Sequence, residues 1–423
     1  MTSTSRAAAA GSIGGGREGA AASAAAGSSG AGVGSSGAGV GPSGAGVGPA
    51  GAARAAAPAS VADRSTAVPA GERAGIVEFY RRASTEELGA RARALCEKVH
   101  GTEILLRGLI EFSNDCALDC LYCGIRAGNA SVERYRLEPE ELVATVETAY
   151  RAGLRSFVLQ SAEDPWYTTD RLAGAVARIK GSFPDAAITL SCGIKTLGQY
   201  RELKAAGADR YLLRFETSDP ELHRRLRGGI TLERRLQALE DLKVAGYQVG
   251  SGFMVGLPGE TEETRIANAL LCAELELDMV GIGPFIPHPA TPLALSPQEP
   301  LELTLRATSL LRLLLPRAHL PATTAAGSLD PSGREQMIAA GANVLMPNMT
   351  PTPVRKNYLL YPGKICLDEA GEKCLGCLAL RMKSVDRELS FGRGDSLRLA
   401  PAVQAAAAAA GTAGGAASAG SAR

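Results

Sequence analysis

This 423-residue sequence lacks a sizeable net charge and a long apolar run, and it has few aromatic residues. Each of these absences excludes a class of function or limits how the core can be built. Its 45 basic residues nearly cancel its 44 acidic ones, so no excess of one charge sign draws it to nucleic acid or to an anionic membrane. No apolar run is long enough to span a bilayer. Only 4% of the residues are aromatic, so any core must be built from Leu, Val, Ile and Ala. We therefore expect a folded protein that binds neither nucleic acid nor membranes.

The two ends of the chain lack the side chains that a core requires. Residues 1–72 are mostly Ala, Gly and Ser, with a repeat visible in SSGAGVG and PSGAGVG, and residues 400–423 have the same character. Such segments bury too little apolar surface to offset the chain entropy that folding removes. We therefore predict disordered extensions at 1–72 and 400–423, and one large domain over residues 73–399.

The N-terminal extension is also poor in acidic residues and carries Arg6 and Arg17. This composition permits an organellar transit peptide, but we favour a low-complexity extension without a targeting role. The chain has no convincing secretory signal, so disulfides are not the expected use of its nine cysteines. The predicted location is the reducing cytoplasm.

Within the domain, strand-like and helix-like patterns alternate after a helical lead-in at 73–100, where Ser84 and Glu87 fit a capping box. The strand-like runs are LIEFS (109–113), SFVLQS (156–161), AITLS (187–191), RYLLRFE (210–216), VGSGFMVG (249–256), DMVGIGPF (278–285), LPATTA (320–325) and ANVLMP (342–347). Alternating βα units form a parallel sheet, and eight units can close into a TIM-type (βα)8 barrel. Because the last two runs are weak, the pattern alone also allows a six-stranded partial barrel.

Three cysteines follow directly after the first of these strands. Cys116, Cys120 and Cys123 in CALDCLYC have the spacing C-x3-C-x2-C. Three thiolates can hold three irons of a 4Fe–4S cluster and leave the fourth iron open to a small molecule. A zinc site usually has four ligands and paired C-x2-C units, so zinc and chance are the weaker explanations. The carboxyl end of a strand is also where a barrel carries its chemistry.

This motif and several longer segments resemble the HydE family, the radical S-adenosylmethionine (SAM) maturases of FeFe-hydrogenase. The segments are EFSNDCALDCLYCGIR, VLQSAEDP, AGADRYLLRFET, GFMVGLPGET, DMVGIGPFIPHPATPLA, PATTA, GANVLMPNMTPTPVRKNY and LYPGKIC, and they span about residues 105–380. Biotin synthase and methylornithine synthase share the fold and the first motif, but IGPFIPHP, NVLMPNMTP and LYPGKIC look like the maturases. The resemblance implies a closed (βα)8 barrel, a 4Fe–4S cluster, bound SAM and a 5′-deoxyadenosyl radical used in assembling the di-iron subcluster of the H-cluster.

The resemblance also assigns residues to SAM, which carries groups of both charge signs. The set that it implies is Tyr122, Gln160, Ser161, Thr189, Arg214, Glu216, Arg235, Met279 and Ile282. An arginine fork suits the SAM carboxylate, although a solvated helix face for Arg235 and core packing for Met279 stay open. Two positions depart from the family. Ala162 stands where glycine is expected, which is costly if the backbone needs a positive φ, and Phe215 stands where histidine is frequent.

For the substrate, the resemblance implies a set at the far side of the barrel mouth, namely Thr323, Thr324, Met346, Asn348 and Tyr361. Neighbouring residues of a strand point to opposite faces, so only one of the two threonines can face the barrel interior. The implied substrate is an organometallic iron–cysteine–carbonyl–cyanide complex made by a partner maturase. The implied reductant is a ferredoxin or a flavodoxin.

A second cysteine group, Cys366, Cys374 and Cys377, lies in segment 362–380 with the spacing C-x7-C-x2-C. It predicts an auxiliary 2Fe–2S or 4Fe–4S cluster, which only some members of the resembled family carry, and zinc with a fourth ligand stays open. Two other functions also stay open. One is a radical SAM enzyme that acts on another small molecule, as methylornithine synthase or biotin synthase does, and the other is a non-catalytic iron–sulfur or zinc protein.

Overall fold

The computed structural model describes residues 65–368 and 371–399, so residues 1–64 of the extension predicted at 1–72, and all of the extension predicted at 400–423, lie outside the described residues. The boundary that we predicted at residue 73 is too late. The Val68 amide donates to the Leu314 carbonyl at 2.9 Å, Thr66 is buried, and a helix begins at Ala70. The composition did not reveal this segment, because a few residues that pack against the domain hardly change the mean composition of a long low-complexity stretch.

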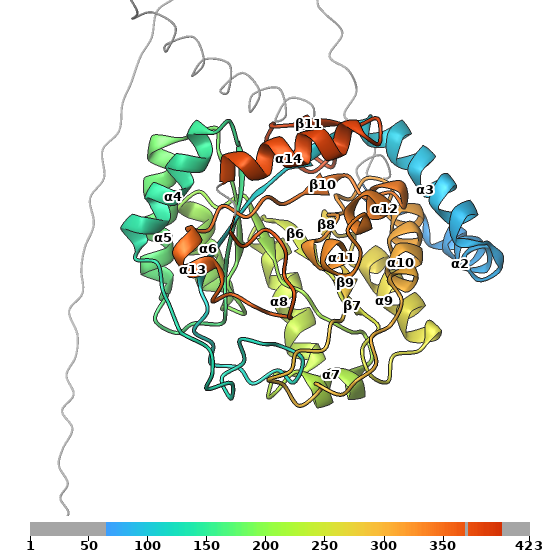
Figure 1. The fold of residues 1–423 in the computed structure, drawn as a ribbon, viewed down its shortest axis with the longest axis horizontal. Helices are drawn as coiled ribbons and strands as arrows, with labels where there is room; N and C mark the ends of the chain where they lie inside the picture. The colour runs from blue at the N-terminus through green and yellow to red at the C-terminus, as the bar shows by residue number, and fades with distance from the viewer. Residues whose placement is uncertain (1–64, 369–370, 400–423) are drawn as a thin grey trace, which may run out of the picture. The chain divides into compact units, whose positions relative to one another are not determined.

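Helices and strands alternate along most of the described chain (Figure 1). The helices are α2 (Ala70–Arg82), α3 (Thr85–His100), α4 (Pro139–Arg151), α5 (Thr169–Ser182), α6 (Leu197–Ala205), α7 (Pro220–Leu226), α8 (Leu232–Val244), α9 (Glu262–Glu274), α10 (Leu301–Leu314), α11 (Thr324–Leu329), α12 (Gly333–Ala339), α13 (Thr352–Arg355) and α14 (Gly371–Lys383). The strands are β1 (Glu103–Leu106), β2 (Gly108–Ser113), β3 (Ser156–Ser161), β4 (Ala187–Ser191), β5 (Arg210–Leu212), β6 (Gln248–Ser251), β7 (Met254–Val255), β8 (Met279–Val280), β9 (Gly283–Pro284), β10 (Val344–Leu345) and β11 (Glu388–Ser390). Among these helices, none combines the length and the apolar character needed to cross a membrane.

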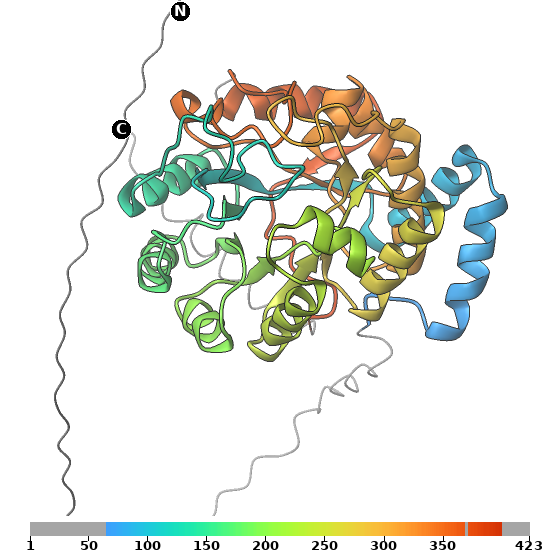
Figure 2. The same ribbon diagram turned by 90° about the horizontal axis from the view of Figure 1, so that it is seen from below.

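The strands close into a parallel barrel, with the helices arranged around it (Figures 1 and 2). Six strands follow one another in the order β2-β3-β4-β5-β6-β8, and every pair is parallel. Three isolated parallel bridges complete the ring, from Met279 to His319, from Pro321 to Val344 and from Leu109 to Asn348. The last bridge is reinforced by the Leu109 amide, which donates to Pro347 O at 2.9 Å. Counting the segment around residues 319–321 and β10, eight segments form the closed (βα)8 barrel that the sequence predicts.

The predicted strands at 109–113, 156–161 and 187–191 match β2, β3 and β4 closely. The runs 249–256 and 278–285 are each divided in two. Gly252 lies in the first division at φ +150°, and a β-carbon there would lie 2.0 Å from Gly281 O, so the two backbones touch where both runs break. A pattern of apolar residues does not predict these breaks, because they arise where two backbones remote in the sequence meet.

The predicted strand at 320–325 is right at its start, which belongs to the barrel, and wrong at its end. Only Pro321 forms a bridge, and α11 begins at Thr324 with Thr323 as its N-cap residue. Threonine is favoured both in strands and at helix starts, and the pattern of this short run did not separate the two. The sequence analysis also missed β1 and β11, which pair with each other in parallel. The capping box of α3 at Ser84 is confirmed.

The side chains of β2 point alternately toward the surrounding helices and into the barrel. Ile110 and Phe112 belong to the same buried apolar cluster as Leu142 and Val146 of α4, so they pack beneath the surrounding helices. Glu111, between them, points the other way, because successive side chains of a strand face opposite sides. The outer face of the wall is therefore apolar, and the interior of the barrel holds polar and charged groups that need partners.

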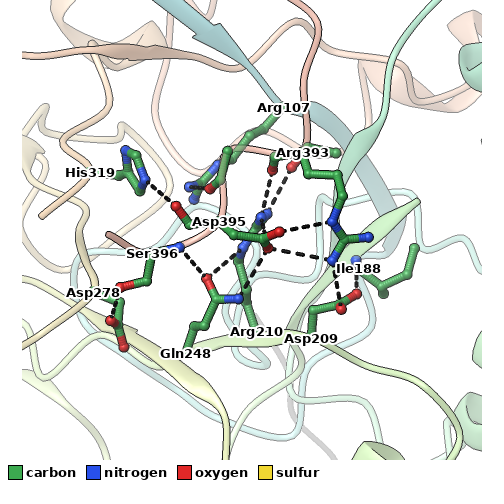
Figure 3. Close-up of polar contacts among 12 residues, drawn as sticks. Arg107, Ile188, Asp209, Arg210, Gln248, Asp278, His319, Arg393, Asp395 and Ser396 are labelled. Atoms are coloured by element: carbon green, nitrogen blue, oxygen red, sulfur yellow. Dashed lines mark hydrogen bonds and ion pairs between the residues drawn. The ribbon is translucent and has the colours of Figure 1, made fainter. Parts of the chain in front are cut away.

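The chain after β11 crosses the end of the barrel where the strands begin, and Figure 3 shows its contacts there. Asp395 lies at the centre. Its carboxylate accepts from Arg210 Nη2 at 2.8 Å, from Arg393 Nε at 2.8 Å and from Gln248 Nε2 at 3.1 Å. Arg210 is the first residue of β5 and is 0% exposed. We call residues 393–398 the floor segment, because they supply the acceptors that this buried cation requires.

We expect Asp395→Asn to lower the free energy of unfolding by about 3–5 kcal/mol, because Arg210 would stay buried without its carboxylate. Burial alone would raise the pKa of Asp395, but Arg210 and then Arg393 outweigh burial and hold that pKa well below its ordinary value. Such a group stabilises the fold above its unfolded pKa of about 3.9, and the stabilisation is lost as pH falls toward the folded pKa. Urea unfolding should therefore give a constant difference between about pH 5 and 8 that narrows below about pH 4.

Glu147→Gln is the matched control, since Glu147 pairs with Arg151 on the surface of α4 at 2.5 Å. Its loss should change the free energy of unfolding by less than about 0.5 kcal/mol. An Asp395→Asn protein as stable as the wild type at pH 7 would show that the floor segment contributes no net stability.

Candidate functional site

The three cysteines of the first motif lie on the loop that follows β2, at the carboxyl end of the barrel. Cys120 is buried, and Cys116 and Cys123 are partly exposed. The loop turns tightly, because the Cys123 amide donates to Cys120 O at 3.2 Å. It is also anchored by Asn114, whose side chain donates to Asn357 O at 2.6 Å. The strand end, the turn and this anchor set the directions of the three thiols.

These thiols border a cavity of about 200 Å³ at the carboxyl ends of β3, β4 and β5. Nine of the predicted site residues line it, namely Cys116, Cys120, Tyr122, Cys123, Gln160, Ser161, Arg214, Glu216 and Arg235. They come from segments up to about 120 residues apart in the sequence, and the parallel strands bring them to one end of the barrel. The cavity therefore unites the cysteine motif with most of the residues expected to hold its ligand.

The cysteines are not arranged around one metal ion. Within residues 65–368 and 371–399, no three His, Cys, Asp or Glu side chains are placed to bind a single ion. Zinc needs all its ligand atoms at about 2.0–2.3 Å from one centre, whereas an iron–sulfur cluster gives each cysteine its own iron. Three cysteines at the spacing C-x3-C-x2-C match the second requirement, one thiolate for each of three irons.

Burial raises the pKa of the Cys120 thiol, and the nearby Arg227 works against this shift. Burial and then Cys120 raise the pKa of Cys123 to about 12, with Arg227 again opposing. Neither thiol ionises readily by itself at neutral pH. Metal binding would supply the positive charge that stabilises both thiolates.

Arg214 and Glu216 both line the cavity, and their charged groups lie next to each other. Arg214 Nη2 lies 2.9 Å from Glu216 Oε2, yet the geometry is not that of a hydrogen bond, and both atoms lack a hydrogen-bond partner in the described structure. Glu216 also has φ +69°, a conformation that side chains other than glycine rarely adopt. Strain of this kind costs about 1–3 kcal/mol and concentrates at functional sites. The guanidinium of Arg214 can therefore still donate hydrogen bonds to a ligand, and the carboxylate of Glu216 can still accept them.

Arg235 is buried on α8 and points into the same cavity. Its Nη2 lies 3.3 Å from Glu163 Oε1, while its Nε has no hydrogen-bond partner in the described residues. Glu163 also pairs with Arg227 at 3.0 Å. The sequence analysis missed Glu163 and Arg227. Glu163 lies in VLQSAEDP, one of the segments that carry the family resemblance, whereas Arg227 lies in an arginine-rich stretch to which the sequence analysis assigned no role.

The comparisons with known proteins agree with this geometry. Residues 110–272 match the model of the Radical SAM superfamily. The [FeFe] hydrogenase maturase subunit HydE of Thermotoga maritima is 46% identical over 307 residues, which cover 73% of this chain and 88% of that protein.

The chain belongs to the HydE family of radical SAM enzymes.

More distant relatives share the barrel. The 3-methylornithine synthase of Methanosarcina barkeri is 31% identical over 271 residues, covering 63% of this chain and 75% of that protein. The crystal structure of methylornithine synthase (PylB) superposes with a TM-score of 0.65 at 26% identity, covering 75% of this chain and 94% of that chain. A crystal structure of HydG, a maturase of the [FeFe]-hydrogenase, has the same TM-score at 16% identity and covers 81% of each chain, so this likeness concerns the fold.

The residues present fit a radical SAM cofactor pair. SAM carries an ammonium and a carboxylate, and the cavity offers unsatisfied polar atoms of both kinds on Arg214, Glu216 and Arg235. A buried polar group without a partner costs free energy, so these atoms are accounted for most simply by a zwitterionic ligand. The three neighbouring thiols supply one ligand each to three irons.

The two departures from the family pattern prove harmless to the fold. Ala162 does not have a positive φ, so the expected backbone cost is absent. It packs against Ile125 and Tyr358, and its amide donates to Ser113 O at 2.9 Å. Phe215 is fully buried and its ring stacks on that of Phe253 at 6.0 Å. Phe215 is therefore part of the apolar core and not of the cavity wall.

Three residues that we assigned to SAM do not line the cavity. Thr189 is buried two residues before Ser191, which does line it. Met279 lies at the floor end of β8, where its Sδ accepts from Arg107 Nη1 at 2.9 Å. Ile282 belongs to the apolar core. The strand pattern gave the right face for Thr189 but not the depth along the barrel axis.

The residues assigned to the substrate lie outside the same cavity. Thr323 approaches Met337 Sδ, and the hydroxyl of Thr324 accepts from Arg334 Nη2 at 3.5 Å, so both threonines stand at the start of a helix. Asn348 donates to Glu111 Oε2 at 3.1 Å inside the barrel. The other two residues, Met346 and Tyr361, are partly exposed. It is Tyr358, three residues earlier than Tyr361, that lines the cavity.

The second cysteine group lies apart from the cavity. Cys374 and Cys377 are one helical turn apart on α14, the first buried and the second exposed. Cys366 precedes the helix at φ +63°. Its Sγ lies 3.6 Å from Arg334 Nη2, and its carbonyl accepts from Arg355 Nη1 at 3.3 Å. Two arginines close to a thiol are a suitable setting for a thiolate ligand.

We expect Glu216→Gln to weaken SAM binding roughly tenfold or more while the chain keeps its iron, because a charge-assisted hydrogen bond contributes about 1.5–3 kcal/mol. The measurement is calorimetric titration of the anaerobically reconstituted protein with SAM, after the iron content has been determined. Glu221→Gln is the control, since Glu221 is an exposed glutamate of α7 that pairs with Arg224 at 2.6 Å. Equal SAM affinity in both variants would remove Glu216 from the binding site.

Proposed function

We propose that this chain acts in assembling the di-iron subcluster of the FeFe-hydrogenase H-cluster. One observation carries the proposal. The cavity joins three cysteines to unsatisfied atoms of Arg214, Glu216 and Arg235, in a chain that is 46% identical over 307 residues to a HydE. In this proposal the three cysteines hold a 4Fe–4S cluster, and SAM binds at its open iron.

The bound cluster and SAM supply a one-electron cleavage that yields a 5′-deoxyadenosyl radical, and the protein supplies everything around it. Arg235 and Arg214 provide fixed positive charge for the SAM carboxylate. Glu216 and the side chain of Gln160 provide acceptors for the ammonium. The cavity walls limit the access of water to the reactive centre.

The proposed substrate is a small organometallic iron–cysteine complex made by another maturase. A polar barrel interior supports this class of substrate, since Glu111, Asn348 and Lys364 place hydrogen-bonding groups inside the wall. The proposed electron donor is a ferredoxin or a flavodoxin. A reducing compartment, the cytoplasm, suits both the donor and the thiols.

Methylornithine synthesis is the second candidate function. It is favoured by the 31% identity to a 3-methylornithine synthase and by the TM-score of 0.65 to PylB. It ranks second because the identity to HydE is higher and extends over a larger share of both proteins. The two candidates share the cofactors and differ only in the substrate.

The experiment that tests the proposal is anaerobic reconstitution of the full chain with SAM and the iron–cysteine–carbonyl–cyanide precursor. We expect an adenosylated iron–cysteine product by mass spectrometry, and none from Cys120→Ala, which removes one of the three cluster ligands. Accumulation of 3-methylornithine from a mixture of amino acids, with no adenosylated iron product, would transfer the assignment to the second candidate. Neither product in a protein that cleaves SAM would contradict both.

For the second cysteine group we propose an auxiliary iron–sulfur cluster that is dispensable for radical generation. Cys374→Ala should lower the bound iron yet keep SAM cleavage close to the wild-type rate, because α14 lies outside the cavity. Iron content and 5′-deoxyadenosine are the two measurements, and Cys272→Ala, which alters a buried cysteine of α9, is the control. Loss of cleavage in a folded Cys374→Ala protein would contradict this role, and bound zinc in place of the second cluster would favour a structural site.

A further inference from the structure

Arg227 lies where the end of α7 meets the cysteine loop. The Leu121 amide donates to Leu226 O at 2.9 Å, so the residue before Arg227 is bonded directly to that loop. Gly228 follows at φ +38°, and a β-carbon there would lie 3.0 Å from Asp119 O. The backbone on both sides of Arg227 is therefore packed against the segment that carries the three cysteines.

The guanidinium of Arg227 joins two loops that are remote in the sequence. Its Nη1 donates to Tyr122 Oη at 2.8 Å, and its Nη2 donates to Glu163 Oε1 at 3.0 Å. Tyr122 immediately precedes the third cysteine, and Glu163 follows β3. The Arg227 side chain is only 12% exposed, and its Nε has no hydrogen-bond partner in the described residues. This cation is thus fixed by contacts on two sides and shielded from water.

The charges around Arg227 do not cancel. Glu163 is the carboxylate partner of both Arg227 and Arg235, at 3.0 and 3.3 Å, so these three side chains carry one surplus positive charge. Arg214 and Glu216 are paired with each other at 2.9 Å and add none. The surplus charge lies on the cavity wall that the cysteines share.

We propose that Arg227 favours the reduced state of the cluster held by the three cysteines, in addition to fixing Tyr122 beside it. The proposal rests on the radical SAM function proposed above. Reduction takes one electron from an external one-electron donor, and no bond forms or breaks and no proton moves. A fixed cation in a site of low dielectric stabilises the added negative charge, and net charge and nearby hydrogen bonds are known to set cluster potentials. Arg227 therefore raises the midpoint potential, which falls when its charge is removed.

Two substitutions separate charge from contact. Arg227→Gln removes the charge but keeps a donor for Tyr122 or Glu163, and Arg227→Lys keeps the charge but loses the fork that reaches both. Arg225→Met is the matched control, since Arg225 is a neighbouring arginine of α7 that is exposed and donates to Pro258 O at 2.6 Å. Charge at an exposed position is screened by solvent and salt.

The test is an EPR-monitored redox titration of the full chain, reconstituted anaerobically and free of SAM and substrate, after iron has been quantified. We expect a negative shift of the midpoint potential in Arg227→Gln, and wild-type potentials in Arg227→Lys and Arg225→Met. A wild-type potential in fully loaded Arg227→Gln would overturn the proposal. If Arg227→Gln does not retain iron, loading of Arg227→Lys at the wild-type potential supports the role of charge, and failure of both variants overturns it in favour of a contact that only holds the loop.

A second readout uses SAM cleavage with two reductants. Cleavage by Arg227→Gln should fall with dithionite and recover with the stronger reductant titanium(III) citrate, whereas a misassembled site would not recover. Because the titration contains neither the iron–cysteine precursor nor any partner maturase, its outcome does not depend on the hydrogenase assignment. Failure of the adenosylated product alone would contradict the proposed function and leave the potential shift intact.

Discussion

Charge inside a closed barrel must be neutralised by other side chains, because little water reaches it, and this requirement organises the molecule along the barrel axis. At the floor, Arg210 is neutralised by Asp395. Nearer the mouth, Glu111 accepts from Lys364 Nζ at 2.6 and 2.7 Å. Asp395 and Lys364 both come from the last part of the described chain. That part is therefore an integral component of the barrel, although it follows the last of the barrel strands.

The need to neutralise buried charge also helps to locate the functional site, because several charged groups there lack hydrogen-bond partners. At the mouth, Arg214, Glu216 and Arg235 keep polar atoms without hydrogen-bond partners in the described structure, and Glu216 has a strained backbone besides. Single unsatisfied atoms occur elsewhere, such as Arg107 Nε at the floor, but this cavity gathers several of them, on groups of both charge signs. Buried polar atoms without partners cost free energy, so a compensating interaction is expected in the cavity. A ligand with groups of both charge signs supplies that interaction. The three cysteines beside this cavity indicate which cofactor accompanies the ligand.

The sequence predicted the cysteine motif and the strand faces that form the site. It did not predict how far along the barrel axis each residue lies. The spacing of Cys116, Cys120 and Cys123 located one wall of the cavity, and alternation along the strands located β2, β3 and β4. Thr189 has the right face but lies too deep, and Met279 is at the floor, because periodicity gives the side of a strand but not its stagger against its neighbours. Thr323 and Thr324 were assigned to a strand although they begin α11, because the end of a short strand and the start of a helix share their preferred residues.

The residues that sequence reasoning missed are those whose role arises only from topology. Glu163 and Arg227 are ordinary charged residues in their local contexts, and they become partners only because parallel strands bring successive loops to one end of the barrel. The Glu111–Lys364 pair joins residues still farther apart, 253 positions in the sequence against 64 for Glu163 and Arg227. Lys364 also donates to Tyr358 O at 3.0 Å, and the Tyr358 side chain lines the cavity. One buried ion pair thus links the strand before the first cysteines to the segment before the second group. The C-terminal segment can therefore complete the wall of the cavity while its own cysteines lie outside it.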